Sequence, residues 1–318
     1  MPLRDSLLAT LVATIWGCNF LVIEWGMSGV PPLLFVSIRF VAVVFPAILL
    51  VPRPEASWRT IIGVGTFMSL GQFTFLYVAL DAGLPPGIAA LVLQAQVVFT
   101  VAIAAVVLRE RPHPQQVVGV FVGVIGLVLV GLGRGGDVAI TAFGLCLLGA
   151  LSWGIGNVVS RSSGVTGGLS LTVWSALMVP LPAFLLALVV HGPTAVAEGL
   201  GAFGWRSAVS TLYTSGLASL VGYGIFNTLL ARHQSSQVVP FVLLAPVVAM
   251  SAAAALLDQR PNALEIAGAA SMVGGVLIVL RSGRTSGPSA VHAMSEALEA
   301  DRPTATGVEL KSYTPTRH

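Results

Sequence analysis

Residues 13–17 read ATIWG, and residues 150–154 read ALSWG, 137 positions later (150 − 13 = 137). A second match follows in the same order: FPAILL at 45–50 pairs with LPAFLL at 181–186, 136 positions later (181 − 45 = 136). Matches that keep their order and nearly keep their spacing indicate that the chain contains two copies of one unit. The repeat therefore decides which copy each of the remaining segments is assigned to.

The composition places both copies in a lipid bilayer. Hydrophobic residues make up 55% of the 318-residue chain, charged residues make up only 9%, and the mean hydropathy is +0.90. Soluble domains carry roughly 25% charged residues, far more than this chain offers to cover a surface. The sequence therefore predicts an all-α integral membrane protein.

Ten apolar runs are long enough to be membrane-spanning helices, which need about 20 residues each. The runs are 7–27, 32–51, 61–80, 86–108, 115–133, 138–160, 169–190, 207–230, 237–257 and 263–281. We expect ten transmembrane helices, five in each copy, and assign residues 1–133 to the first copy and 134–285 to the second. Residues 286–318 are rich in small polar and charged side chains, which predicts a disordered cytoplasmic tail.

The two copies are expected to have opposite orientations in the membrane, because each contains an odd number of spans. The first copy's loop RERP at 109–112 carries two arginines, and its counterpart DQRP at 258–261 carries one arginine and an aspartate. Arginine favours the cytoplasmic side of a membrane, so the two loops are predicted to lie on opposite sides. The predicted fold class is thus two inverted five-helix repeats.

The loop arginines also predict the orientation of the whole chain. With the N-terminus inside, nine of them are cytoplasmic and three are external. The cytoplasmic ones are Arg4, Arg53, Arg59, Arg109, Arg111, Arg161, Arg232, Arg281 and Arg284, and the external ones are Arg134, Arg206 and Arg260. We therefore expect a multi-pass protein with both termini in the cytoplasm.

Inverted repeats are typical of secondary transporters, which bind their substrate near the bilayer midplane where the repeats meet. Such a transporter works by alternating access, which exploits the symmetry between the halves. The alternative is an old duplication that is kept only for helix packing. The polar residues inside the spans favour transport.

The two-copy plan, with WGCNF at 16–20, resembles the EamA-type transporters of the drug/metabolite transporter superfamily over roughly residues 5–281. Four further stretches are similar to bacterial exporters of cysteine and O-acetylserine: PPLLFVSIRF (31–40), LVLQAQVVFT (91–100), VGYGIFNTLLARH (221–233) and PFVLLAPVV (240–248). The resemblance implies export of small amino-acid metabolites across the bacterial inner membrane. One departure concerns the family's acidic residue before the Arg-Pro pair, which is Glu110 in the first copy but Gln259 in the second.

The stretch WGCNFLVIEWG at 16–26 places polar groups inside an apolar span. Trp16 lies about ten residues into that span, or about 15 Å deep at 1.5 Å per residue. Asn19 follows Trp16 by three residues and Asn157 follows Trp153 by four, so each amide shares a helix face with its indole. We predict that both pairs bind substrate; interhelical hydrogen bonding without a ligand is the alternative.

Four more positions are candidate substrate-binding residues. Tyr223 and Asn227 are four apart in one span and form a third aromatic–amide pair. Ring faces and amide oxygens can receive the ammonium group of a zwitterion, and N–H donors can receive its carboxylate. Gln72 and Gln94 are further candidates, although glutamine also serves as a packing residue in membranes. Gln96 lies on a different helix face from Gln94.

Arg39 lies about seven residues into the second span, where an arginine costs about 2.5–3.5 kcal/mol on insertion scales. We expect it to bind substrate and to have an anionic partner, either Glu24 or a substrate carboxylate; a purely structural ion pair is the alternative. Glu24 is the proton-coupling candidate, because proton-driven transport needs a titrating group in the path. Its place near the end of a span also fits a hydrated carboxylate.

Two other functions fit parts of the sequence. Multidrug efflux of lipophilic cations requires a carboxylate facing the cavity, which makes Glu24 decisive, and Arg39 in the same cavity would repel cations. A membrane-embedded enzyme requires clustered ligands or nucleophiles, whereas the five histidines lie in loops, at span ends or in the tail.

We therefore expect no enzymatic activity, no metal and no cofactor. The expected partners are a small-molecule substrate and the lipid bilayer, with no nucleic acid. The protein is expected to be a monomer or a homodimer.

Overall fold

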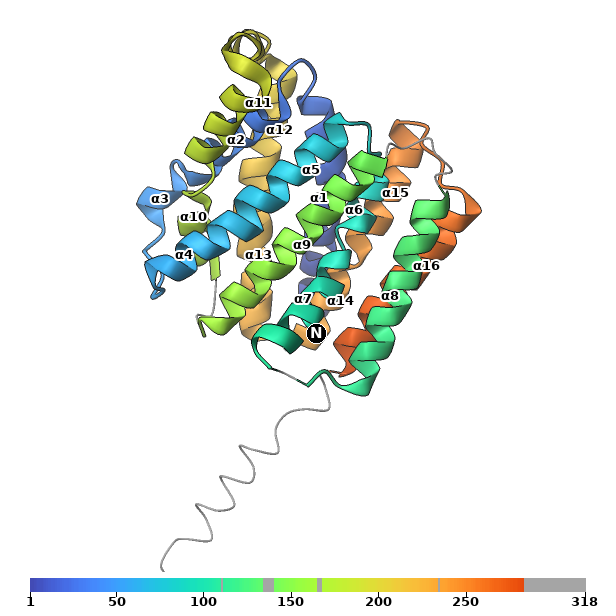
Figure 1. Cartoon of the computed structure of the whole chain (residues 1–318). Coiled ribbons are helices and arrows are strands. Elements are labelled where there is room, and N and C mark those ends of the chain that lie inside the picture. The colour runs from blue at the N-terminus through green and yellow to red at the C-terminus, as the bar shows by residue number, and fades with distance from the viewer. Residues whose placement is uncertain (110, 134–139, 165–167, 234, 283–318) are drawn as a thin grey trace, which may run out of the picture.

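The structure is a computed structural model that describes residues 1–109, 111–133, 140–164, 168–233 and 235–282. Every regular element in these ranges is a helix, and the helices form one bundle (Figure 1). The all-α prediction is confirmed for this part of the chain. Two other predictions, the acidic residue Glu110 and the tail at 286–318, lie outside the described residues.

Sixteen α-helices and two π-helices make up the described bundle. The predicted first copy contains α1 (Leu3–Gly26), α2 (Pro32–Val44), α3 (Ala47–Leu50), α4 (Trp58–Val64), η1 (Gly65–Gly71), α5 (Gln72–Asp81), α6 (Pro86–Val92), α7 (Ala95–Val107) and α8 (Pro114–Gly133). The second contains α9 (Ile140–Ser162), α10 (Gly168–Ala176), α11 (Pro180–Gly201), α12 (Trp205–Leu212), η2 (Tyr213–Val221), α13 (Gly222–Arg232), α14 (Ser235–Val242), α15 (Leu244–Leu256) and α16 (Ala263–Ser282).

Seven helical runs among the described residues are long and apolar enough to cross a membrane. They are Leu3–Gly26, Pro32–Leu50, Trp58–Asp81, Pro86–Val107, Pro114–Gly133, Ile140–Ser162 and Gly168–Gly201. Pro240–Leu256 and Ala263–Val279 are apolar but shorter, and the run from α12 to α13 is not among the seven. The chain is thus a multi-pass membrane protein, and the crossing of all ten predicted spans stays a prediction.

Helix irregularities recur at matching positions in the two copies. η1 and η2 interrupt the third and eighth helical runs, and their Ser-Leu pairs at 69–70 and 219–220 are 150 positions apart (219 − 69 = 150). The fourth and ninth runs are divided at Gln94, which precedes α7, and at Leu243, which precedes α15. π-helical segments are frequent at functional sites, so η1 and η2 direct attention to the space between them.

The two copies contact each other through equivalent helices. α1 packs on α15 and on the η2–α13 run, while α9 packs on α7 and on the η1–α5 run. The glycine of each Trp-Gly pair lies at a point of closest approach. A Cβ atom at Gly17 would lie 2.6 Å from the Ala245 carbonyl oxygen, and one at Gly154 would lie 2.8 Å from the Phe99 Cβ. The repeated ATIWG and ALSWG stretches therefore mark two close helix crossings.

α8 and α16 lie side by side at one flank of the bundle (Figure 1). Gly119 faces Gly275 and Gly126 faces Gly268, so closely that an added Cβ atom would lie 2.5–2.6 Å from the facing carbonyl oxygen. Residue numbers rise along α8 as those of the facing residues fall along α16, so the two helices are antiparallel. Glycine pairs of this kind let membrane helices approach closely.

α2 and α11 are antiparallel by the same reasoning. Gly199, near the end of α11, packs on Pro31, just before the start of α2. Further along, the Ser37 Oγ donates to the carbonyl of Pro180, the first residue of α11, at 2.8 Å. The largest cluster of buried apolar side chains lies beside this pair, where α2, α5, α6 and α9 meet.

Candidate functional site

A cavity of about 210 Å³ lies among helices of both copies. Its walls come from α2, the α4–η1–α5 run, α9, α10 and the η2–α13 run. Ser160 and Gly168 line it near the end of α9 and the start of α10, so the cavity extends toward that end of the bundle. A water molecule takes up about 30 Å³ of liquid, so the space suits a small organic molecule.

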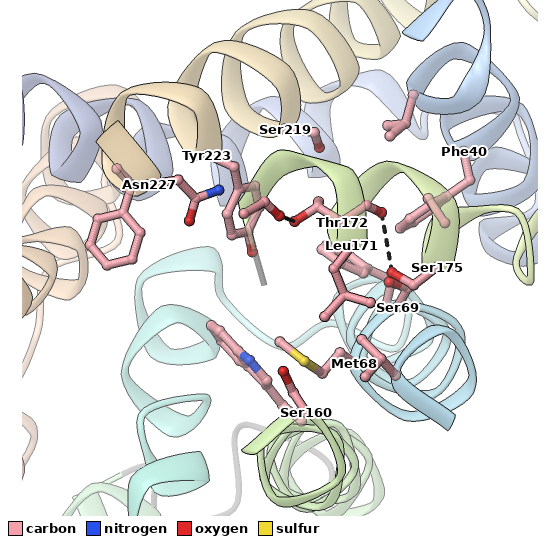
Figure 2. Close-up of a pocket in the computed structure, with 17 residues that line it drawn as sticks. Phe40, Met68, Ser69, Ser160, Leu171, Thr172, Ser175, Ser219, Tyr223 and Asn227 are labelled. Atoms are coloured by element: carbon pink, nitrogen blue, oxygen red, sulfur yellow. Dashed lines mark hydrogen bonds between the residues drawn. The ribbon is translucent and has the colours of Figure 1, made fainter. Parts of the chain in front are cut away.

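Three predicted site residues line this cavity: Trp153 from α9, and Tyr223 and Asn227 from α13. Figure 2 shows Tyr223 and Asn227 on one wall, with Met68 and Ser160 across the open space from them. An indole, a phenol and an amide together supply hydrogen-bond donors, acceptors and ring faces. The fold therefore brings both members of the Tyr223–Asn227 pair to the cavity, but only the tryptophan of the Trp153–Asn157 pair.

Hydroxyl groups supply most of the remaining polar lining, and the sequence reasoning missed them. Ser69, Thr172, Ser175 and Ser219 all line the cavity. The Ser175 Oγ donates to the Thr172 carbonyl at 3.2 Å (Figure 2), and the Ser219 Oγ donates to the Thr214 carbonyl at 2.8 Å. The repeated Ser-Leu pair of η1 and η2 is the sequence signal that identifies Ser69 and Ser219.

Trp16 lies behind the cavity wall rather than in it. Its ring centre is 5.0 Å from that of Tyr223 and 5.3 Å from that of Phe226, and both of these residues line the cavity. The Trp16 Nε1 donates to the Ala218 carbonyl at 2.9 Å. Trp16 therefore positions two lining residues, whereas its equivalent Trp153 reaches the cavity itself.

Arg39 lies behind another part of the wall and is only 2% exposed. Its Nη1 donates to the Tyr77 hydroxyl at 3.1 Å, and its Nη2 donates to the Ser219 Oγ at 3.3 Å. The Arg39 Cζ lies 4.1 Å from the centre of the Phe73 ring. Because Phe73 and Ser219 line the cavity, one layer of side chains separates the cation from it.

The ion pair considered between Arg39 and Glu24 is not formed. Among the described residues, hydroxyl groups, a carbonyl and ring faces surround Arg39, and no carboxylate lies within 4.0 Å of it. Glu24 is half-buried in α1 and does not line the cavity. Glu265 is a second carboxylate inside a predicted span. It is buried and pairs with Asn262 in a capping box at the start of α16.

The two predicted asparagines have different surroundings, and neither lines the cavity. The Asn157 Nδ2 donates to the Gln96 Oε1 at 2.7 Å and to the Thr100 Oγ1 at 3.1 Å, which links α9 to α7. Asn19 is buried, and its Oδ1 has no hydrogen-bond partner among the described residues. These contacts match the interhelical alternative for Asn157 and leave Asn19 with a free acceptor.

Gln72 and Gln94 are both buried and also lie outside the cavity lining. Gln72 begins α5 directly after η1, and Gln94 directly precedes α7. Both glutamines thus lie where a helical run changes its geometry. Their assignment to substrate binding stays a prediction.

The other end of the bundle is closely packed. Asp5, at the start of α1, contacts His233 just after α13, so the start of α1 lies at the cavity's end and Gly26 lies at the opposite end. There the Ser207 Oγ donates to the Gly26 carbonyl at 2.8 Å, and the rings of Trp25 and Trp205 meet at 5.3 Å. The cavity therefore extends toward one end of a bundle whose other end is packed shut.

Known proteins are similar to this chain in sequence and in fold. The model of the EamA-like transporter family matches residues 4–132 and 140–281. A "Probable amino-acid metabolite efflux pump" of Salmonella typhimurium is 39% identical over 299 residues, which cover 90% of this chain and 100% of the relative. A protein of the same name from Escherichia coli is 38% identical over 284 residues, covering 87% of this chain and 95% of the relative.

A solved crystal structure covers 90% of this chain and 99% of its own, with a TM-score of 0.59 and 20% sequence identity. A likeness at this identity concerns the fold alone. The family match, by contrast, extends over nearly all of both copies and includes every helix that lines the cavity. The apolar helices, the cavity between the copies and these matches agree: the chain belongs to the EamA-like transporter family and is a membrane transporter rather than an enzyme.

Proposed function

We propose that this protein is a secondary transporter that exports small amino-acid metabolites, such as cysteine or O-acetylserine, across the bacterial inner membrane. The observation that carries the proposal is the cavity between the two copies, lined by Trp153, Tyr223 and Asn227. Its hydroxyl, amide and aromatic groups suit a small zwitterion. The names of the Salmonella and Escherichia coli relatives point to the same substrate class.

The proposed mechanism is alternating access between two inverted repeats. The antiparallel pairing of α8 with α16, which are equivalent helices of the two copies, supports the inversion. The antiparallel pairing of α2 with α11 supports it too, because these helices belong to the equivalent runs Pro32–Leu50 and Gly168–Gly201. The two ranges matched by the family model support the proposed units at 1–133 and 134–285. In addition, α1 packs on helices of the second copy as α9 packs on the equivalent helices of the first. Alternating access requires such matching contacts, because the two copies adopt each other's conformation when the protein changes state.

The proposed orientation has both termini in the cytoplasm, as the loop arginines predict. The cavity then extends toward the cytoplasm, since it lies near the ends of α9 and α13, where Arg161 and Arg232 are found. This is the state in which an exporter takes up its substrate. We propose ten spans in all and, as before, a monomer or homodimer.

Efflux of lipophilic cations is the second candidate. Of the described residues that line the cavity, none is acidic. Arg39 lies directly behind Phe73 and Ser219, and its charge acts on the cavity through a medium of low dielectric constant. This arrangement disfavours a cationic substrate and favours one that carries a carboxylate.

Glu24 remains our candidate for the coupling proton. It is half-buried in α1 and outside the cavity lining, so we propose it as a proton carrier and not as a substrate ligand. A Glu24→Gln variant whose transport keeps its full response to an imposed pH gradient would exclude this role.

Counterflow in proteoliposomes tests the proposed substrate. Purified protein is inserted into liposomes loaded with unlabelled O-acetylserine, and entry of the labelled compound is followed. We expect counterflow by the unmodified protein and a loss of about tenfold, equivalent to roughly 1.4 kcal/mol, for Trp153→Ala and for Asn227→Ala. Both substitutions remove side chains that line the cavity.

Thr228→Val is the matched control, because Thr228 follows Asn227 in α13 and its hydroxyl donates only within the helix, to the Gly224 carbonyl at 2.8 Å. It should transport normally. Absence of O-acetylserine and cysteine counterflow by correctly inserted protein would contradict the substrate class. Transport of a lipophilic cation under the same conditions would favour the second candidate.

A further inference from the structure

Exchanging the two copies places a region equivalent to the cavity on the opposite side of the bundle, and that region is closed. Matching FPAILL to LPAFLL pairs Arg39 with Ser175 (39 + 136 = 175), and matching the Ser-Leu pairs places Tyr77 opposite Asn227 (77 + 150 = 227). Asn227 lines the cavity and is partly exposed, whereas Tyr77 is 0% exposed. Ser175 also lines the cavity, but it is 1% exposed and so is as closely buried as Arg39 at 2%. The position of Asn227 is thus open to the cavity, while the equivalent position of Tyr77 is closed.

Four residues at the centre are common to both regions. Ser69 is equivalent to Ser219 and Phe73 to Tyr223, and all four line the present cavity. If each of these residues is replaced by its equivalent in the other copy, the same set of four is obtained. A second access path on the opposite side of the bundle would therefore begin at this centre and pass Arg39 and Tyr77.

Arg39 holds three helical runs together across that path. Arg39 lies in α2, and its Nη1 donates to the Tyr77 hydroxyl of α5 at 3.1 Å. Its Nη2 donates to two groups of η2, the Ser219 Oγ at 3.3 Å and the Thr214 carbonyl at 3.5 Å. We call Arg39, Tyr77, Thr214 and Ser219 the Arg39 clamp. Without these acceptors a buried guanidinium would be costly, so the contacts favour the closed path.

Ser219 connects the clamp to the cavity. Its side chain lines the cavity, accepts from the Arg39 Nη2, and donates to the Thr214 carbonyl. A carboxylate placed against Ser219 would offer Arg39 a charge-assisted hydrogen bond, which is about twice as strong as a neutral one. It would also compete with Thr214 for the Ser219 hydroxyl. A ligand without a carboxylate would leave the clamp intact.

We propose that the Arg39 clamp closes the second access path and that the carboxylate of a bound substrate releases it. Arg39 is then the residue that couples recognition of a carboxylate to opening on the opposite side. The substrate part of this inference rests on the proposed function, whereas the clamp rests on the contacts alone.

Thiol labelling tests the clamp without any substrate. In a background with Cys18→Ala and Cys146→Ala, Val36→Cys reports on the second path, since Val36 is 0% exposed and is equivalent to the cavity-lining Thr172 (36 + 136 = 172). A small membrane-impermeant thiol reagent is added on the side away from the cavity. We expect Arg39→Gln and the milder Tyr77→Phe each to raise the labelling rate of Val36→Cys about tenfold or more.

Thr172→Cys, labelled from the cavity's side, is the matched reporter and should react more slowly in the same two variants. Thr228→Val should change neither rate, because its hydroxyl bonds only within α13. Unchanged labelling of Val36→Cys in both folded clamp variants would overturn the proposal.

O-Acetylserine and its methyl ester then test release by a carboxylate, with the clamp left intact. We expect the acid to accelerate labelling of Val36→Cys and the ester to leave it unchanged. An equal effect of the two compounds would overturn the carboxylate's role. If neither compound acts while the clamp variants label rapidly, the clamp is supported and the substrate proposed above is contradicted.

Discussion

The crossing of α9 with α7 and the crossing of α1 with α15 are built from equivalent parts, yet they differ in their polar groups. Both crossings are close because a glycine follows the tryptophan, Gly154 in one and Gly17 in the other. In the first crossing, Asn157 is bonded twice to α7. In the second, the Oδ1 of Asn19 has no partner among the described residues.

The facing helices explain this difference. The two copies contain similar facing segments, and LVLQAQVVFT at 91–100 aligns with FVLLAPVVAM at 241–250 (241 − 91 = 150). The partners of Asn157, Gln96 and Thr100, are replaced by Pro246 and Met250. A proline has no side-chain acceptor and a thioether is only a weak one. The comparison teaches that the copies share the shape of the crossing but not its hydrogen bonds.

The largest effect is expected from filling the shared glycine contacts. Gly17→Val and Gly154→Val each add a side chain whose Cβ atom alone would lie 2.6–2.8 Å from an atom of the facing helix, so each should destabilise the fold by about 1–3 kcal/mol. The measurement is the thermal unfolding midpoint in detergent. Gly144→Ala is the control in α9, since no atom lies within 4 Å of its added Cβ. If both valine variants unfolded at the same temperature as the unmodified protein, the two glycines would not mark close crossings.

A smaller effect should separate the two asparagines. Asn157→Ala removes two interhelical hydrogen bonds, and such bonds average about 0.6 kcal/mol in membranes, so we expect a loss of about 1 kcal/mol. Asn19→Ala removes an amide whose acceptor is unpaired, and we expect a loss near zero. The same unfolding assay measures both variants. Equal losses would show that the two crossings do not differ as described.

The smallest effect is the coupling between Asn157 and Gln96. A double-mutant cycle with Asn157→Ala and Gln96→Ala should give a coupling free energy of about 0.6 kcal/mol, because the two side chains share one hydrogen bond of 2.7 Å. Asn19→Ala combined with Gln96→Ala serves as the uncoupled reference. Strict additivity in the first cycle would mean that the bond adds nothing to stability.

Much of the fold was predictable because apolar run length and helix position are directly related in a membrane. Each of the ten predicted runs coincides with helical segments in the described residues. The Trp-Gly repeat likewise predicted equivalent positions, and the structure adds the reason, which is the close crossing at Gly17 and Gly154. The breaks at η1 and η2 were not predicted, because a π-turn depends on packing from neighbouring helices and leaves no periodicity in the sequence.

The candidate site was predictable only in part. Trp153, Tyr223 and Asn227 stood out as large polar groups within spans, and they line the cavity. Ser69 and Ser219 line it too, but a serine within a membrane helix is too common to stand out alone. Asn157 was equally conspicuous in the sequence, yet its amide is bonded to Gln96 and Thr100. Which face of a span meets the cavity depends on how the other spans pack around it.

The sequence by itself determined that the chain is an apolar, multi-pass membrane protein, because composition and span length are local properties, and its repeated motifs predicted the two copies. Only the tertiary structure decided that Arg39 is held by Tyr77 and Ser219 rather than by Glu24, since Arg39 and these two partners come from three helical runs far apart in the chain. It also decided that Thr172 opens on the cavity while the equivalent Val36 is closed. A repeated sequence determines which positions are equivalent, and the packing of one state decides which of the two is exposed.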